Sequence, residues 1–165
     1  MFNYTHWFAS FPPELATFLI SGLPISELRG AIPIAYTVYD LPLWSAFFWS
    51  FLGNTLSALI AIAVLEPLSN FLSKHFSFWR RFFIWLFERT RQKHAQKFAK
   101  WGALALITFV AIPLPLTGGW SGAVAAFVFG IPAKKASLYV TLGILIAGII
   151  VSLVTFGGVR GWQIL

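Results

Sequence analysis

The amino-acid sequence predicts an all-α integral membrane protein in which residues 1–165 form a single membrane domain. Of its 165 residues, 58% are hydrophobic and only 10% are charged, and the mean hydropathy is +0.78. Soluble domains carry about 25% charged residues. Two uninterrupted apolar segments are long enough to cross a bilayer, and two others are broken by proline and glycine in a similar pattern. These observations predict two repeats, each a broken helical hairpin followed by a transmembrane helix.

The first repeat, expected at residues 14–66, opens with an apolar region from Glu14 to Tyr39. Two glycines, two prolines and two charges interrupt this region: Gly22, Pro24, Glu27, Arg29, Gly30 and Pro33. Each arm of about a dozen residues reaches only ~18 Å, roughly half of a bilayer. We therefore expect a re-entrant hairpin, with a pair of short or kinked full spans as the alternative. Non-helical backbone at that depth must face protein or a wet cavity, because lipid cannot satisfy its polar groups.

The transmembrane helices are expected where about 20 apolar residues follow one another. Leu43 to Leu65 meets this requirement and ends at Glu66-Pro67, and Ala136 to Phe156 meets it after Lys134-Lys135. The second repeat, residues 101–157, begins with a second broken hairpin from Trp101 to Ile131. Its interruptions are Pro113, Pro115, Gly118, Gly119 and Gly122.

Residues 67–100 join the two repeats and are strongly basic. Eight of the twelve Lys and Arg residues lie between Lys74 and Lys100, against one acid, Glu88. The stretch FSFWRRFFIWLF (76–87) mixes basic with aromatic residues, which favours a membrane surface over nucleic acid. Phe71 and the apolar residues of this stretch recur at helical spacing, which predicts an amphipathic surface helix. Those in the stretch are Phe78, Trp79, Phe82, Phe83 and Leu86. By the positive-inside rule, residues 68–100 are cytoplasmic.

The two halves also match in sequence, since GAIPIAYTVY (30–39) aligns with GAVAAFVFGI (122–131). A hairpin that enters and leaves on one side adds no crossing. Each repeat then crosses the membrane once, so the second copy is inverted relative to the first. The hairpin tips would meet near the midplane, as in secondary transporters whose broken helices form the binding site.

A chain with two spans and two hairpins buries little internal surface, so we expect a homodimer embedded in membrane lipids. Gly53 and Ser57 in the first span align with Gly143 and Ala147 in the second. Small residues four apart let helix backbones approach closely, which makes these two pairs candidate dimer contacts.

Glu27 and Arg29 are candidate functional residues, because charges inside a membrane are costly and function is the default hypothesis for them. Two residues apart, they would diverge on a helix, but in a broken tip both can face one cavity. Arginine offers a fork of donors to an oxyanion, and a carboxylate in a dry site can exchange a proton. The alternative is a shallow interfacial turn that these charges merely stabilise.

The second tip contributes three further candidate binding residues, Thr117, Trp120 and Ser121. The proline and glycine residues of both broken regions are expected to shape the hairpin tips: Pro24, Gly30, Pro33, Pro113, Pro115, Gly118, Gly119 and Gly122.

The sequence carries no sign of metal or catalytic chemistry. It contains no Cys, and His6, His75 and His94 are scattered without a second ligand at metal-binding spacing. No P-loop and no cluster of nucleophile and base is present at the tips. We therefore expect no enzymatic activity, metal or cofactor. Residues 1–13 lack a basic n-region and contain two prolines, so we do not expect a signal peptide.

The motifs ELRGAIP (27–33) and PLPLTGGWSGA (113–123) resemble the small multidrug export protein family of prokaryotes, over roughly residues 14–157. The resemblance implies export of small compounds across the cytoplasmic (inner) membrane. The layout resembles more remotely the DedA family and its VTT-domain relatives, which have paired re-entrant hairpins and are associated with moving lipid phosphates. This chain departs from the DedA pattern because its second tip has no Arg.

Two functions follow from these features. The first is a proton-coupled exporter of small compounds, in which Glu27 exchanges protons. The second is a flippase or scramblase for an anionic lipid such as a polyprenyl phosphate, in which Arg29 binds the headgroup. An intramembrane enzyme is disfavoured, and a non-transporting assembly factor stays open.

Overall fold

The computed structural model describes residues 11–78, 81, 102–114 and 117–164, and the described residues form helices and turns without a strand. In the first half, helices α2 (Pro13–Gly22) and α3 (Glu27–Thr37) precede the long helix α4 (Leu43–His75). In the second half, the helix Gly102–Ala111 and α6 (Gly119–Val128) precede the long helix α7 (Ala133–Ile164). Both halves therefore have two short helices followed by one long helix, and the all-helical prediction is confirmed for the described residues.

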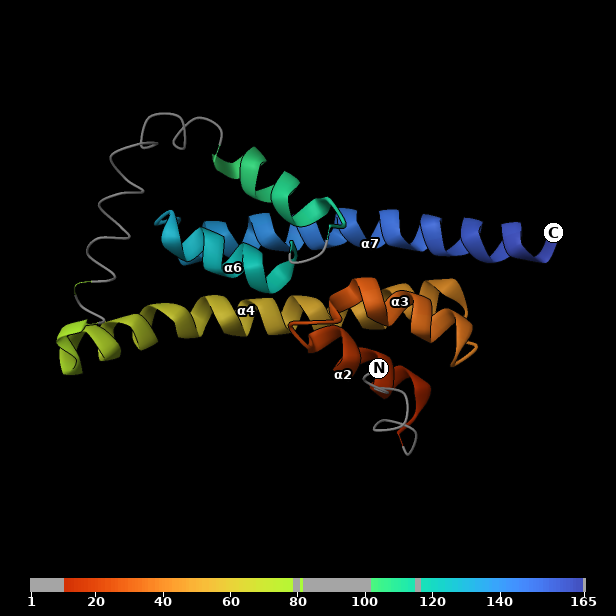
Figure 1. The fold of residues 1–165 in the computed structure, drawn as a ribbon, viewed down its shortest axis with the longest axis horizontal. Coiled ribbons are helices and arrows are strands. Elements are labelled where there is room, and N and C mark those ends of the chain that lie inside the picture. Colours follow the sequence, from red (N-terminus) through yellow and green to blue (C-terminus); the bar gives the residue numbers. More distant parts are fainter. Residues whose placement is uncertain (1–10, 79–80, 82–101, 115–116, 165) are drawn as a thin grey trace.

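Helices α4 and α7 are the two described helices that are long and apolar enough to cross a membrane. They run side by side in opposite directions along the long axis of the molecule (Figure 1). They include the two predicted spans, but α4 does not end at Glu66-Pro67. It continues to His75, with Pro67 inside the helix. Proline removes one backbone hydrogen bond, and here that loss does not end the helix.

Each pair of short helices forms a hairpin whose turn lies near the middle of the two long helices. The turn between α2 and α3 is Leu23–Ser26, where the Ser26 hydroxyl donates to the Ile20 carbonyl at 2.6 Å. In Figure 1 the α2–α3 pair comes from one end of the long helices and the second pair comes from the other end. The two turns therefore face each other.

Three residues expected at the hairpin tips lie inside helices instead. Gly30 and Pro33 belong to α3, and Gly122 belongs to α6. A Cβ on Gly122 would overlap the Val110 side chain, so this glycine lets α6 approach the helix Gly102–Ala111. The turns are shorter than the sequence suggested, because these prolines and glycines are tolerated within short helices packed by tertiary contacts.

The small-residue pairs predicted to make dimer contacts are used inside the chain. A Cβ on Gly53 would overlap the Phe18 carbonyl and the Ser21 hydroxyl of α2. A Cβ on Gly143 would lie 2.6 Å from Val110 Cβ and 3.0 Å from the Ile107 carbonyl. Each glycine thus packs its long helix against the first arm of its own hairpin. Gly53, Gly143 and Ala147 are buried within one chain and Ser57 is half-buried, so this packing argues against these faces as dimer contacts.

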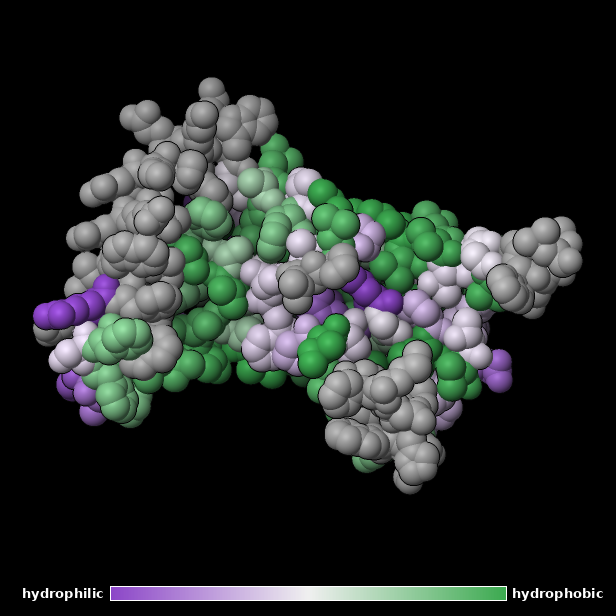
Figure 2. Space-filling model, in the orientation of Figure 1, coloured by the Kyte–Doolittle hydropathy of each residue, from purple (hydrophilic) through white to green (hydrophobic). Residues whose placement is uncertain are grey.

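The outer surface of the long helices is apolar. On α4 an exposed side chain recurs every four residues, in the series Trp44, Phe48, Leu52, Leu56, Ile60, Val64 and Leu68. On α7 the exposed apolar residues include Leu138, Leu142, Ile146, Ile149 and Leu153. In Figure 2 green apolar side chains cover much of the body of the molecule, and purple hydrophilic ones lie toward its ends and in a patch near the middle of this face. A surface of this extent needs an apolar environment, which a bilayer supplies.

The predicted basic surface helix is described only in part. Residues 67–75 continue α4, and the backbone turns to an extended conformation at Phe76. Phe71 and Phe78 are exposed. The expectations for Trp79, Phe82, Phe83, Leu86 and the basic residues of 82–100 lie outside the described residues, as do those for residues 1–10.

Candidate functional site

The site centres on Glu27, which begins α3 at the point where the two hairpin turns meet. Only 6% of its surface is exposed, and its backbone has a φ of 46°, in the left-handed region. A residue with a Cβ rarely adopts that conformation, and strain of this kind clusters at functional sites. The fold thus holds a buried carboxylate on a strained backbone, deep between the long helices.

The Glu27 carboxylate lies at the N-terminus of α6. Its Oε1 accepts a hydrogen bond from the Trp120 backbone N–H at 3.2 Å. The first N–H groups of a helix have no partner within the helix and carry partial positive charge, so they favour an anion. A Cβ on Gly118 would overlap the carboxylate, so the close approach requires glycine at that position. Glu27 therefore acts as an internal anion at the end of α6.

Arg29 reaches the other helix end in the second hairpin. Its guanidinium donates to the carbonyls of Val110 at 3.3 Å, Ile112 at 3.2 Å and Leu114 at 2.5 Å. These carbonyls lie at and just beyond the C-terminal end of the helix Gly102–Ala111, where partial negative charge favours a cation. Glu27 and Arg29 thus point to different helix ends and form no ion pair with each other among the described contacts.

The three polar candidates of the second tip bond mainly to their own hairpin. The Thr117 hydroxyl lies 2.8 Å from the Ile112 carbonyl and 3.0 Å from that of Leu114. The Ser121 hydroxyl accepts from the Gly118 N–H at 2.6 Å and caps α6. Trp120 differs, because its indole N–H donates to the Gly22 carbonyl of the first hairpin at 3.3 Å. These hydrogen bonds stabilise the second hairpin tip and its contact with the first hairpin.

Among the proline and glycine candidates, Pro24 lies in the first turn and Pro113 in the second. Gly118 is the N-cap of α6 and Gly119 is its first residue. A Cβ on Gly119 would lie 2.8 Å from Asn54 Oδ1. Pro115 lies outside the described residues. The glycines therefore give room for side chains that come from α3 and α4.

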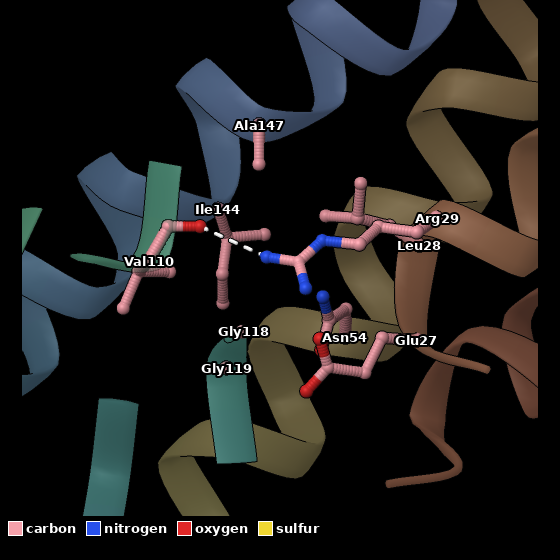
Figure 3. A pocket seen from close by; sticks show the side chains of 9 residues that line it. All are labelled: Glu27, Leu28, Arg29, Asn54, Val110, Gly118, Gly119, Ile144 and Ala147. Carbon is pink, nitrogen blue, oxygen red and sulfur yellow. Dashed lines mark hydrogen bonds between the residues drawn. The ribbon is translucent and has the colours of Figure 1, made fainter. Parts of the chain in front are cut away.

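Asn54 is a site residue that the sequence interpretation missed. It lies on α4, is 1% exposed, and its Oδ1 has no hydrogen-bond partner among the described residues. Figure 3 shows its amide beside both Glu27 and Arg29. A buried polar atom without a partner requires an explanation, such as a water or a ligand. The available signal was an amide in the middle of an otherwise apolar span.

Nine of the described residues line a pocket of about 140 Å³ between α3, α4, α6 and α7, a volume that includes its open mouth (Figure 3). Its polar groups come from Glu27, Arg29 and Asn54, and its apolar wall includes Val110 and Ile144. The side chains that line it leave no space for a water molecule. The pocket is therefore closed around its own side chains. Within the described part of the chain, no group of His, Asp and Glu residues is arranged to hold a metal ion.

A family model described as "Putative small multi-drug export protein" matches residues 27–150. The chain belongs to this family. The match begins at Glu27 and contains Arg29, the second turn and α7 as far as residue 150. No curated protein and no solved structure matches the chain. The remote likeness to DedA proteins therefore has no support from these comparisons.

Family membership and the two long apolar helices identify a membrane protein of an export family. The family description names multi-drug export and does not name a coupling ion or a binding residue.

Proposed function

We propose that this protein is a proton-coupled exporter of small organic cations, and that Glu27 alternately binds a proton and the substrate. The observation that carries the proposal is the buried Glu27 carboxylate at the N-terminus of α6, held from the second hairpin by the Trp120 N–H. Binding of either a proton or a cation neutralises the carboxylate and weakens its attraction to that helix end. One group then links substrate binding to parting of the hairpins.

The position of the site along the long helices supports a place near the bilayer midplane. Asn54 is the central residue of the apolar segment 43–65, and Ile144 is two residues from the centre of the candidate span Ala133–Val159. Both residues line the pocket with Glu27. A span of about 20 residues crosses the hydrocarbon core, so its centre lies near mid-depth.

We further propose that the two hairpins are re-entrant and that the chain is an inverted repeat. The packing of Gly53 on α2 and of Gly143 on the helix Gly102–Ala111 is equivalent in the two halves. The antiparallel long helices and the facing turns are what such a repeat requires (Figure 1). Short helices of 10 and 11 residues reach only about 15–17 Å, roughly half of the hydrocarbon core.

The same proposal includes the prokaryotic cytoplasmic membrane as location, with residues 68–100 on the cytoplasmic side. It rests on the basic composition of that segment and the positive-inside rule. We also propose that the protein transports its substrate without changing it chemically. A homodimer stays a prediction, for which the small-residue faces are no longer candidates.

Transport of an anionic lipid is less well supported than transport of a cation. A lipid phosphate would have to compete for the Arg29 guanidinium, which already donates to three backbone carbonyls, although its buried Nε has no partner among the described residues. Breaking those bonds would leave the buried Val110 carbonyl without its Arg29 donor, which costs free energy in an apolar site, whereas the carbonyls of Ile112 and Leu114 would keep the Thr117 hydroxyl as a donor. Arg29 is better suited to hold the second turn than to bind a headgroup.

The test is proton flux in liposomes that contain the purified protein and a pH-sensitive dye. We expect lipophilic cations, such as tetraphenylphosphonium, to trigger proton movement in the wild type and not in Glu27→Gln. The amide keeps an oxygen that can accept the Trp120 N–H, so this variant should still fold. Glu14→Gln, in the first turn of α2, is the matched control and should transport normally. Equal proton movement in Glu27→Gln would rule out the proposed role, and a response to a polyprenyl phosphate alone would favour the flippase.

A further inference from the structure

One face of α4 carries small and polar side chains at intervals of four residues, in the series Ala46, Ser50 and Asn54. All three are almost fully buried, and residues four apart on a helix lie one above the other. Ala46 packs in a cluster with Ala35 of α3. Asn54 lines the pocket with Glu27 of α3. Ser50 lies between them on the same face, and it therefore also lies where α4 packs against α3.

The polar atoms on this face lack hydrogen-bond partners. Ser50 Oγ and Asn54 Oδ1 are both buried, and neither has a partner among the described residues. Two other serine hydroxyls of α4, those of Ser57 and Ser69, donate to carbonyls of their own helix at 2.9 Å. A buried polar atom without a partner is costly and requires an explanation, such as water that enters in another state. A hydroxyl both donates and accepts, so Ser50 can relay a proton.

The same face of α4 is apolar on the other side of Asn54. One and two turns further along the helix come Ala58 and Ile62, which pack in the main apolar cluster with residues of α6 and α7. Ser50 lies one turn from Asn54 in the opposite direction, toward Leu43. That end of α4 is remote from the basic segment, so the positive-inside rule makes it the outer end. The polar side chains therefore lie between the pocket and the outer surface.

The next polar group toward the outer surface is the hydroxyl of Tyr39. Tyr39 follows the end of α3 and packs against the cluster that contains Ala46, one turn outward of Ser50. Its hydroxyl oxygen is also buried and has no partner among the described residues. Tyr39, Ser50 and Asn54 thus follow one another from the outer end of α4 to the pocket. Ser50 and Asn54 are separated by ~6 Å along the helix axis.

We infer that Tyr39, Ser50 and Asn54 mark the path by which protons reach Glu27 from the outer side of the membrane. The inference rests on the proposed function, because an exporter that exchanges substrate for protons must take them up outside. A step of ~6 Å is too long for one hydrogen bond, so water enters between these groups when α3 moves slightly from α4. A proton from the outer water then binds the Glu27 carboxylate, and no other bond changes. Arg29, the other charged side chain among the described residues that line the pocket, keeps its proton throughout.

The first experiment measures how fast Glu27 is protonated after rapid acidification, by infrared difference spectroscopy of the whole protein in lipid nanodiscs. The carboxyl band that is absent from Glu27→Gln reports this residue. Ser50→Ala should slow protonation by about tenfold, the effect of losing one hydrogen bond in the path. The final amplitude should not change, because no charge near Glu27 is altered. Ser57→Ala is the matched control and should keep the wild-type rate, since that hydroxyl already donates to the Asn54 carbonyl.

The two possible failures of this experiment are distinguishable. Equal rates in the wild type and in Ser50→Ala would overturn the path and leave the proposed function standing. Absence of any carboxyl band that Glu27→Gln removes would contradict the proposed function, and the proton path would fall with it.

The second experiment tests from which side water enters, with single cysteines and Ag⁺ added outside right-side-out membrane vesicles. The chain has no cysteine of its own, and a thiol that water does not reach ionises poorly and does not bind Ag⁺. Ser50→Cys is nearly isosteric and should lose its later reaction with a maleimide, also in a Glu27→Gln background. Ala61→Cys, buried on the inner half of the same face, should keep that reaction. An unprotected Ser50→Cys, or equal protection of Ala61→Cys, would overturn the inference.

Discussion

The Glu27 carboxylate accepts a hydrogen bond from the Trp120 backbone N–H at 3.2 Å, although 93 residues separate the two in the chain. Two positions further along α3, Arg29 donates to carbonyls at the end of the helix Gly102–Ala111. The first hairpin therefore supplies both charges, and the second supplies two helix ends of opposite polarity. This pairing explains why the start of α3 carries a Glu and an Arg, since each satisfies backbone groups at a helix end of the second hairpin.

Gly118→Ala is predicted to separate Glu27 from α6. The added Cβ would overlap the carboxylate, whereas the backbone at Gly118 is extended and accepts any residue. The effect is therefore steric and local. We expect transport to be lost with destabilisation of about 1–3 kcal/mol, measured by thermal unfolding and by proton flux. Gly157→Ala, with nothing within 4 Å of the added atom, is the control and should behave as the wild type. Normal flux in Gly118→Ala would mean that contact between Glu27 and α6 is dispensable.

Arg29→Lys is predicted to loosen the second turn while it keeps the charge. An ammonium cannot reproduce the planar fork that serves the carbonyls of Val110, Ile112 and Leu114. We expect the free energy of unfolding to fall by about 1–3 kcal/mol, because the carbonyl of the buried residue Val110 loses its donor. Hydrogen exchange should become faster in peptides that cover residues 108–121 and stay unchanged in the middle of α7. Unchanged exchange at the second turn would show that charge alone, without the fork, holds it.

Asn54→Leu is predicted to lower transport without lowering the stability of the fold. Leucine has a similar volume and removes the Oδ1 atom that has no partner, so unfolding should need the same or slightly more free energy. If Asn54 contacts substrate or water when the hairpins part, transport should fall at least tenfold. Thermal unfolding and cation-driven proton flux measure the two effects. Full transport by Asn54→Leu would make Asn54 a packing residue only.

Much of the fold could be predicted because it depends on local properties of the chain. Segment length and hydropathy identified α4 and α7, and proline with glycine identified both interruptions. Charge in an apolar region singled out Glu27 and Arg29. These signals need no knowledge of which helices pack together.

The details that sequence reasoning missed all depend on tertiary contacts. Asn54 has no local signal that distinguishes a site residue from a tolerated amide. Gly53 and Gly143 show that a small residue permits close packing without indicating which helix approaches. The partners of Arg29 are carbonyls, and these exist only once the second turn is placed against α3. The residues at the tips of broken helices are therefore easier to find than their roles.

Gly143→Leu is predicted to destabilise the monomer rather than to separate two copies. Even a Cβ at this position would lie 2.6 Å from Val110 Cβ, so a leucine must push the helix Gly102–Ala111 away from α7. We expect the free energy of unfolding to fall by more than about 2 kcal/mol, and by the same amount at low and high protein concentration. Gly158→Leu, where nothing lies within 4 Å, is the matched control. A change in oligomeric state without a change in unfolding would contradict the intramolecular contact.

Single-cysteine labelling is predicted to distinguish a re-entrant first hairpin from a pair of full spans. The chain has no cysteine, so each variant carries one reactive thiol. Pro12→Cys and Val38→Cys, at the outer ends of α2 and α3, should react with a membrane-impermeant maleimide from outside the cell. Lys134→Cys, at the start of α7, should react only when the inner face is opened.

The decisive position is Ile25, which is 85% exposed at the tip of the first turn. In a re-entrant hairpin Ile25→Cys lies at mid-depth and reacts from neither side, because a thiol in lipid does not ionise readily. In a pair of full spans the same cysteine reaches the inner surface. It then reacts with the maleimide under the same conditions as Lys134→Cys, only when the inner face is opened.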